Sequence, residues 1–354
     1  MTSVYLHIPF CLRKCPYCAF SSAPMRDGDE ALFLEAVERE LVVRGRRAKK
    51  IETLYIGGGT PSVLSGDVWR KLHDLLEGAF FFSDDAEVTV EANPNSLTAE
   101  QLMLWRDWRV TRVSLGVQSF DDAELQFLGR LHDARTAVDA VVAARAAGFA
   151  VSLDLMFGLP GSNVRNWARS LHEAVAIRPG HISVYQLTVE KGTPFAEKNF
   201  TLPDGYDQYR YAQWYLPKKN YFQYEVASFA TPGRESRHNA NYWADGDYIG
   251  IGPGAWGYEG GVRYRNAPLL ADYARMMAQG GNAVAFEERL EGEPAVRQAA
   301  VLALRTARGI DWRNFSERYG KNFTDAIKKD IETFPNDLFD KDETSARLTP
   351  KGMR

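Results

Sequence analysis

The three cysteines constrain this chain of 354 residues more than any other feature, because all three fall within one short run. Cys11, Cys15 and Cys18 stand in Cys-Leu-Arg-Lys-Cys-Pro-Tyr-Cys, and the sequence contains no other cysteine. An odd number excludes a fully paired set of disulfides, and a structural zinc site would need a fourth ligand from elsewhere. A [4Fe–4S] cluster is held by thiolates, so three of them leave one iron open to a different ligand. The spacing favours a reactive cluster, with a zinc site and three unrelated cysteines as the alternatives.

The composition is that of a folded protein without a nucleic-acid partner. Hydrophobic residues make up 45% of the chain, and 43 Lys and Arg against 46 Asp and Glu give a net charge of −3. This balance provides no basic surface for a polyanion. The sequence has no basic and apolar leader at its start and no apolar run long enough to be a transmembrane segment. We therefore expect a cytoplasmic protein with reduced thiols.

Short strands rich in branched apolar residues alternate with helical patterns along the first 220 residues. Strands are predicted at residues 4–8, 53–56, 87–90, 112–115, 151–155 and 181–187. Helices are predicted between them, among others at residues 30–46 and 134–147. Buried parallel strands separated by helices indicate an α/β fold. We predict an incomplete (β/α)6 TIM-like barrel over residues 1–220.

Polar residues and glycines stand at the carboxyl ends of these strands, where α/β barrels carry their sites. The second strand ends in Gly-Gly-Gly-Thr-Pro-Ser at residues 57–62, whose glycines let a ligand approach the backbone closely. Glu91 ends the third strand, Gln118 follows the fourth with Arg130 beyond it, and Asp154 ends the fifth. Singly, each could be a surface charge or a cap. Together with the cysteines they indicate a ligand site at the barrel mouth.

The pattern Cys-x3-Cys-x2-Cys, with an aromatic residue before the last cysteine, resembles the radical S-adenosylmethionine (SAM) superfamily. In that superfamily SAM chelates the fourth iron through its amino and carboxylate groups, and the reduced cluster cleaves it to a 5′-deoxyadenosyl radical. The resemblance implies a [4Fe–4S] cluster on Cys11, Cys15 and Cys18, SAM as a second cofactor, and an electron donor as a partner.

SAM carries a carboxylate, an ammonium group and ribose hydroxyls, so its site needs both a cation and hydrogen-bond acceptors. Arg130 would supply the cation, and Glu91 and Asp154 would be among the acceptors. The SAM residues implied by the resemblance are Tyr5, Tyr17, Gly58, Gly59, Thr60, Glu91, Gln118, Arg130, Asp154, Gln186 and Trp256.

Further runs resemble the coproporphyrinogen-oxidase-like branch of this superfamily over nearly the whole chain, among them Gly-Val-Gln-Ser-Phe and Asp-Leu-Met-Phe-Gly-Leu-Pro-Gly. The branch contains HemN-type dehydrogenases, which oxidatively decarboxylate coproporphyrinogen III without oxygen, and HemW-type haem chaperones. The dehydrogenases carry a further cysteine directly after the motif and an N-terminal extension before it. Here Ala19 and Phe20 follow Cys18, and ten residues precede Cys11. The resemblance therefore favours the HemW type.

Residues 237–243 match the His-Asn-x-x-Tyr-Trp motif that is associated with haem in the HemW family, and we call them the haem motif. The resemblance implies haem contacts through His238, Asn239, Tyr242 and Trp243, with imidazole as the iron ligand. Trp256 stands where relatives usually have histidine. Because the haem motif lies far from the cysteines in sequence, we expect substitution of His238 to leave cluster and SAM binding intact.

The rest of the chain is divided into a connecting segment, 221–285, and a small, mainly helical C-terminal domain, 286–354, similar to that of the HemN branch. Amphipathic stretches at 295–306 and 315–334 are the basis of this prediction. The last residues resemble the entry to a further helix, which leaves open a truncated or a naturally short domain.

These features predict a haem chaperone that binds haem as cargo and delivers it to acceptor haemoproteins such as respiratory-chain components. One alternative is an oxygen-independent coproporphyrinogen III dehydrogenase of porphyrin biosynthesis. Another is a radical enzyme with a different substrate. The sequence names no catalytic residue and no oligomeric state.

Overall fold

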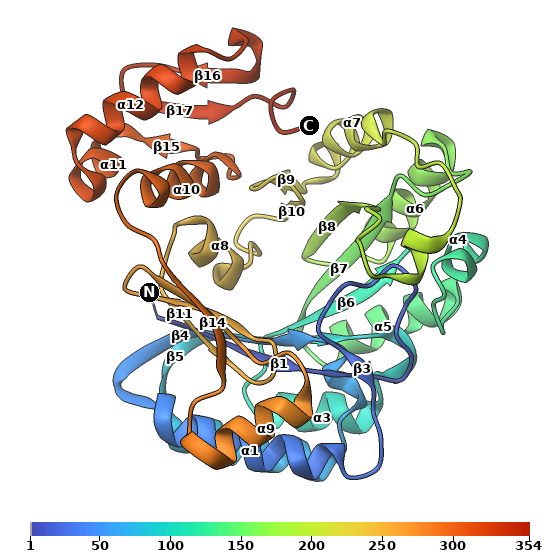
Figure 1. The fold of residues 1–354 in the computed structure, drawn as a ribbon. Helices are drawn as coiled ribbons and strands as arrows, with labels where there is room; N and C mark the ends of the chain where they lie inside the picture. Colours follow the sequence, from blue (N-terminus) through green and yellow to red (C-terminus); the bar gives the residue numbers. More distant parts are fainter. Residues whose placement is uncertain (1) are drawn as a thin grey trace.

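One twelve-stranded sheet forms the centre of the computed structural model, which describes residues 2–354 apart from the side chains of residues 46–49. Six neighbouring strands are parallel and follow one another in chain order (Figure 1). They are β1 (Ser3–Ile8), β4 (Arg46–Gly58), β5 (Phe80–Ala92), β6 (Arg112–Gln118), β7 (Ala150–Phe157) and β8 (His181–Gln186). All six predicted strands are present, although β4 and β5 extend well before their predicted starts. The prediction of an α/β fold is confirmed.

Helices cover the outer side of these strands (Figure 1). They are α1 (Asp29–Arg44), α2 (Gly66–Ala79), α3 (Ala99–Asp107), α4 (Asp122–Phe127), α5 (Ala134–Ala146), α6 (Val164–Ala176) and α7 (Tyr206–Tyr215). Several start at a capping side chain, as Asn163 accepts from the backbone N–H groups of Arg165 and Asn166. Trp69 and Trp105 are fully buried and, with Trp167, pack between the helices and the sheet. The outer side of the sheet is therefore the hydrophobic core.

Shorter strands extend the sheet at both edges. Next to β1 lie β11 (Tyr248–Ile251), β12 (Trp256–Glu259), β13 (Val262–Asn266) and β14 (Val284–Arg289), with α9 (Leu270–Gly280) between the last two. Next to β8 lie β10 (Ser228–Ala230) and β9 (Phe222–Gln223). Within the part of the chain that the structure describes, β14 and β9 do not pair, so the barrel is incomplete. The predicted domain boundary at residue 286 falls inside β14.

The C-terminal segment forms its own small core. Helices α10 (Gly292–Leu304), α11 (Trp312–Tyr319) and α12 (Lys321–Glu332) pack on a sheet of β15 (Ile310–Asp311), β17 (Ser345–Leu348) and β16 (Phe339–Lys341). Helices predominate, as predicted. The expectation of one amphipathic stretch over 315–334 is wrong, because Gly320, at φ 91°, separates two helices. Such a φ favours glycine, which ends α11.

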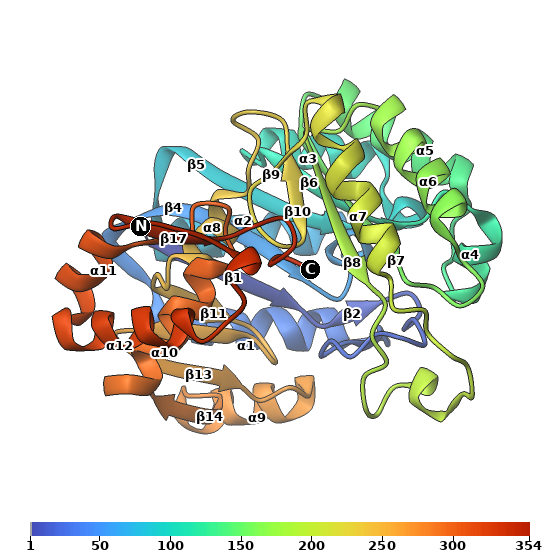
Figure 2. The same ribbon diagram turned by 90° about the horizontal axis from the view of Figure 1, so that it is seen from above.

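A short helix, α8 (Arg237–Trp243), lies between the barrel and the C-terminal domain (Figure 1), and in the view from above the domain lies on the side of α8 and β11–β14 (Figure 2). The Arg305 guanidinium of the domain lies 4.3 Å from the ring centre of Trp243. Asp245, just after the helix, accepts from Arg318 at 3.1 Å and from the hydroxyl of Tyr319 at 2.9 Å. The C-terminal domain is thus fixed to the barrel through α8. No described helix has the length and apolar character that crossing a bilayer requires.

A buried carboxylate joins the first helix to the strands that complete the sheet. Glu40 of α1 accepts hydrogen bonds from Gly252 N–H at 2.8 Å, Tyr273 O–H at 2.6 Å and Asn266 Nδ2 at 2.8 Å. Arg44, one turn later, donates to it at 3.0 Å. Burial raises the pKa of Glu40, and the four donors act against this shift.

We expect Glu40→Ala to lower the free energy of unfolding by about 3 kcal/mol, because it leaves several buried donors without an acceptor. Urea denaturation measures this loss. Glu35→Ala on the same helix is the matched control, since Glu35 is exposed and pairs with exposed Arg39, and its effect should stay within about 0.5 kcal/mol. Equal losses in the two variants would contradict the prediction.

Candidate functional site

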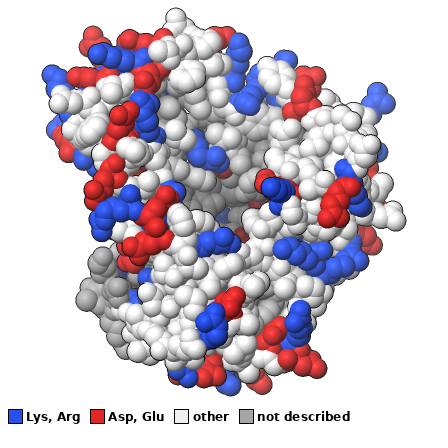
Figure 3. Space-filling view, viewed as in Figure 1, with Lys and Arg blue, Asp and Glu red and all other residues white. Residues whose placement is uncertain are grey.

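A cavity of about 540 Å³ opens at the carboxyl ends of the parallel strands and continues along the concave face of the sheet. Figure 3 shows this side of the molecule hollowed near its centre, with acidic and basic side chains interspersed around it. The predicted residues that line it are Cys11, Cys15, Tyr17, Cys18, Gly58, Gly59, Thr60, Glu91, Gln118, Arg130, Asp154, Gln186 and Asn239. The structure therefore brings together most of the predicted SAM residues and the three cysteines.

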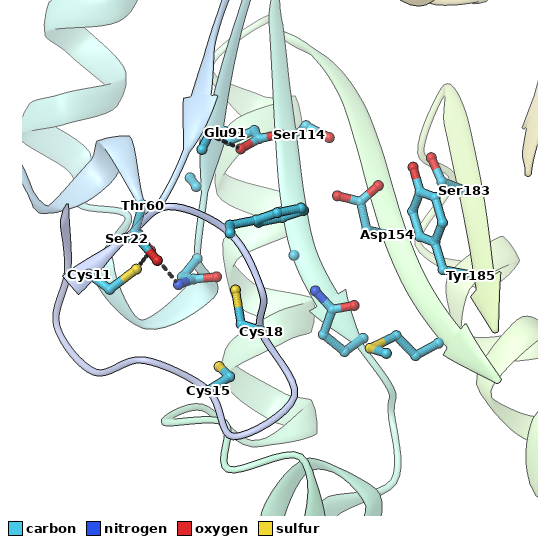
Figure 4. A pocket seen from close by; sticks show the side chains of 18 of the residues that line it. Cys11, Cys15, Cys18, Ser22, Thr60, Glu91, Ser114, Asp154, Ser183 and Tyr185 are labelled. Atoms are coloured by element: carbon cyan, nitrogen blue, oxygen red, sulfur yellow. Dashed lines mark hydrogen bonds between the residues drawn. The ribbon is translucent and has the colours of Figure 1, made fainter. Parts of the chain in front are cut away.

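The three thiols lie on the loop between β1 and α1, at one side of the cavity (Figure 4). Cys11 is buried, and Cys15 and Cys18 are half-buried. The hydroxyl of Thr60 donates to Cys11 Sγ at 3.6 Å, and Arg130 Nη1 donates to Cys15 Sγ at 3.5 Å. Such bonds orient thiolate ligands and stabilise their charge.

The three cysteine thiols fit an iron–sulfur cluster better than a single metal ion. Among the described residues, no three His, Cys, Asp or Glu side chains are grouped as one metal ion requires. A four-iron cluster accepts thiolates spread over its corners, and the cavity beside the loop leaves space for a ligand of the fourth iron. Cys11, Cys15 and Cys18 would hold that cluster.

Asn93, which the sequence analysis missed, joins the two groups that donate to the thiols. Its Nδ2 donates to the hydroxyl of Thr60 at 3.0 Å, and its Oδ1 accepts from Arg130 Nη2 at 2.5 Å. The carbonyl of Gly116 also accepts from Arg130, at 2.6 Å. The Arg130 guanidinium is thereby fixed between the cysteine loop and the strand ends, while its Nε has no hydrogen-bond partner among the residues that the structure describes.

The glycine run after β4 makes room for two side chains. A Cβ atom at residue 57 would lie 2.7 Å from the carboxylate of Glu91, and one at residue 58 would lie 2.4 Å from the ring of His7. Gly58 also has φ 109° and donates its N–H to Glu91 Oε2 at 2.9 Å. These positions need glycine for close approach and for backbone conformation.

Two carboxyl groups face the cavity, Glu91 from β5 and Asp154 from β7, with β6 between the two strands. Burial, and then the negative charge of Glu91, raise the pKa of Asp154 to about 7. Burial also raises the pKa of Glu91, while the Tyr55 hydroxyl, donating at 2.8 Å, acts against this rise. Figure 4 shows Asp154 with Ser183 and Tyr185 across the cavity from the cysteines. The pair can accept from a bound ammonium group, whose positive charge favours ionised carboxylates.

The inward-facing residues of β5–β8 form a polar wall of the cavity, which we call the lower wall. The sequence analysis did not predict it. It is lined by Thr89, Arg112, Ser114, Ser152, His181 and Ser183. These residues alternate with apolar ones along β5–β8, a pattern that indicates strands with one polar face but does not show that this face lines a cavity. Three buried atoms have no hydrogen-bond partner in the described part of the chain: Thr89 Oγ1, His181 Nδ1 and Arg112 Nε. Hydrogen-bonding capacity is therefore available to a ligand or to water at this depth.

Two predicted SAM residues lie outside the cavity lining. Tyr5 is in the wall behind it, where its hydroxyl bonds to His7 Nδ1 at 3.0 Å and its ring stacks on Tyr55. Trp256, 40% exposed, packs with Phe286 and Arg265 on the far edge strands.

The haem motif is packed against the barrel rather than exposed. His238 is 1% exposed, with Nδ1 bonded to Thr53 Oγ1 at 2.9 Å and Nε2 to the hydroxyl of Tyr242 at 2.7 Å. Burial lowers the pKa of His238 to about 3, so the ring is neutral. Of the four predicted haem residues, only Asn239 reaches the cavity.

Comparison with known proteins places this site in a family. The Radical SAM superfamily profile matches residues 5–174, and the HemN C-terminal domain profile matches residues 290–354. The heme chaperone HemW of Bacillus subtilis (strain 168) is 33% identical in an alignment of 366 residues, which covers 99% of this chain and 96% of that protein. This chain belongs to the HemW family. The heme chaperone HemW of Escherichia coli (strain K12) is 39% identical over 72% of the chain and 69% of its own length.

A solved structure shares the fold of this HemW-family chain over almost its whole length. It is coproporphyrinogen III oxidase (HemN) from Escherichia coli, described as a radical SAM enzyme. The TM-score is 0.88 at 25% identity, covering 99% of this chain and 87% of that one. The predicted radical SAM barrel with a HemN-type C-terminal domain is confirmed.

We expect Arg130→Gln to weaken SAM binding by about 1.5–3 kcal/mol, because a guanidinium–carboxylate pair is a charge-assisted bond. Calorimetric titration of the anaerobically reconstituted protein measures the affinity. Iron content must be determined alongside, since Arg130 also donates to Cys15. Arg135→Gln, which breaks an exposed pair with Asp139, is the control. Unchanged SAM affinity in Arg130→Gln with full iron content would show that the carboxylate has another partner.

The raised pKa of Asp154 predicts that SAM binding depends on pH. Below about pH 7 the group keeps its proton, so it offers no charge to the cationic groups of SAM. Affinity should rise about tenfold from pH 6 to pH 8, following the ionised fraction. Asp154→Asn should bind more weakly and lose this dependence. The same pH dependence in both proteins, measured in identical buffers, would assign the titration to another group.

Proposed function

We propose that the protein is a cytoplasmic haem chaperone of the HemW type, which binds haem and delivers it to acceptor haemoproteins. The similarity to the heme chaperone HemW of Bacillus subtilis, over 99% of this chain, carries the proposal. The run Cys18-Ala19-Phe20 supports it, because HemN-type dehydrogenases typically have Cys-x-Cys at this place.

A [4Fe–4S] cluster and SAM are the proposed resident cofactors. Cys11, Cys15 and Cys18 would hold the cluster, and Arg130, Glu91 and Asp154 would bind the charged groups of SAM. A bound and reduced cluster would supply the electron that cleavage of SAM requires. The chain's own contribution is to orient SAM, to fix its charged ends and to surround them with a polar wall.

Binding of haem iron by His238 would require α8 to change its position. The Nδ1 hydrogen is donated to Thr53, whose own hydroxyl hydrogen goes to Ser3, so Nε2 carries the lone pair that an iron atom would need. That lone pair accepts from Tyr242. Ligation of haem by His238 therefore requires Tyr242 to release the ring and α8 to move.

Anaerobic coproporphyrinogen III dehydrogenase is the second candidate function. The fold similarity to HemN, with a TM-score of 0.88, favours it. The polar wall beneath the carboxylates also offers hydrogen bonds to an acidic substrate, among them one from Arg112 Nε, which has no partner within the described residues. Only the dehydrogenase would convert coproporphyrinogen III, so an assay of this conversion distinguishes the two functions.

We expect the reconstituted and reduced protein to bind haem, seen as a Soret band that saturates at micromolar concentration, and not to convert coproporphyrinogen III in the presence of SAM. The control is the Cys15→Ala variant, which should lack the cluster. Formation of protoporphyrinogen by the wild type, together with no haem binding, would replace the chaperone with the dehydrogenase.

A further inference from the structure

His238 is the most firmly fixed side chain of α8. Both ring nitrogens are bonded, to Thr53 and to Tyr242. Its backbone N–H donates to Glu87 Oε1 at 3.0 Å, and the other oxygen of Glu87 pairs with Arg112 at 3.1 Å. The imidazole is therefore held in one place against β4 and β5, below the cavity.

The face of this imidazole packs on Tyr55, two residues beyond Thr53 on β4. The ring centres lie 5.2 Å apart with 33° between the planes. Tyr5 stacks on the same Tyr55 ring, at 6.2 Å and 30°. Because rings from β1 and from α8 both contact it, Tyr55 has little freedom to change its rotamer.

Tyr55 in turn holds the carboxylate of Glu91. Its hydroxyl donates to Glu91 Oε1 at 2.8 Å, and Gly58 N–H donates to Oε2 at 2.9 Å. No other hydrogen-bond donor to this carboxylate is found among the described residues. Glu91 and Tyr55 both line the cavity.

We infer that His238 is a positioning residue of the SAM site, which acts on Glu91 through the ring of Tyr55. Without the imidazole, Tyr55 loses one of its two ring neighbours and its hydroxyl is no longer held against the carboxylate. A buried carboxylate with one donor fewer is harder to ionise. Glu91 would then bind a ligand ammonium group more weakly and only at higher pH.

This role differs from the one that the haem motif suggests. In the structure the imidazole lies behind the cavity lining and packs on Tyr55, which lines the proposed SAM site, so it serves that site only while α8 is in place. An iron atom on Nε2 would displace Tyr242 from it. One imidazole cannot perform both tasks at once, which makes SAM binding and haem ligation by His238 mutually opposing.

A double-mutant cycle on SAM binding tests the inference. Wild type, His238→Ala, Tyr55→Phe and the double variant are reconstituted anaerobically, and SAM is titrated by calorimetry at several pH values without haem. Each single variant should bind SAM about tenfold more weakly, because Glu91 loses one bond to a charged group. The double variant should lose little more than one single variant, because both changes break the same connection.

The pH profile separates positioning from general destabilisation. In His238→Ala and in Tyr55→Phe, Glu91 should ionise only at higher pH and so add a second pH dependence of SAM affinity to that of Asp154, which loss of folded protein would not cause. Arg237→Gln is the matched control on the same helix, since Arg237 is partly exposed and pairs at the surface with exposed Asp85; it should bind SAM within about twofold of wild type. If His238→Ala does not fold, His238→Gln serves instead, because it keeps polar groups but lacks the ring.

Additive losses in the double variant, or wild-type SAM affinity in a folded His238 variant, would overturn the inference. The measurement involves no haem. A protein that fails to bind haem would therefore refute the proposed chaperone function and leave this inference standing. A protein that binds haem but shows additive losses of SAM affinity would refute this inference and leave the chaperone function standing.

Discussion

The carboxylate of Glu91 occupies a space that exists because residue 57 has no side chain. A Cβ atom there would lie 2.7 Å from it, and the next glycine supplies an N–H to one of its oxygens. Tyr55 supplies the other donor. The end of β4, the end of β5 and the glycine turn between β4 and α2 are therefore mutually dependent. A buried negative charge is stable only with such donors, and its position fixes where a cationic ligand group can lie.

The parts of the site that follow from short-range sequence could be predicted. Three cysteines within one loop share a location wherever the chain folds, and the ends of parallel strands meet at one edge of a sheet. The serines and the threonine of the lower wall could not be predicted in the same way. Ser114 and Ser152 alternate with Val and Leu, which is also the pattern of a strand with one solvated face. Curvature of the whole sheet turns that face inward, and no local sequence encodes it.

The contacts of the haem motif also could not be predicted from the local sequence. Its sequence indicates a helix with an imidazole and two aromatic rings, but seven residues do not specify what those rings contact. Besides Tyr242 in the same helix, the partners of His238 are Thr53 and Tyr55. Both are far away in sequence, so no local feature indicates that this segment contacts a residue of the cavity lining. The helix end at Gly320, by contrast, has a local cause. This glycine has a positive φ, which ends one helix and separates it from the next within a continuous amphipathic pattern.

The order of strands in the sheet has a consequence for how the protein is made. β1, which leads into the cysteine loop, lies between β4 and β11. During synthesis from the N-terminus, one edge of β1 stays without a partner until residues 248–251 have left the ribosome. Pairings this distant in sequence form late and leave apolar edges exposed in the meantime. The strand that leads into the cysteine loop is therefore paired on both edges only after two thirds of the chain has been made. A stable cluster site is not expected before that stage of synthesis.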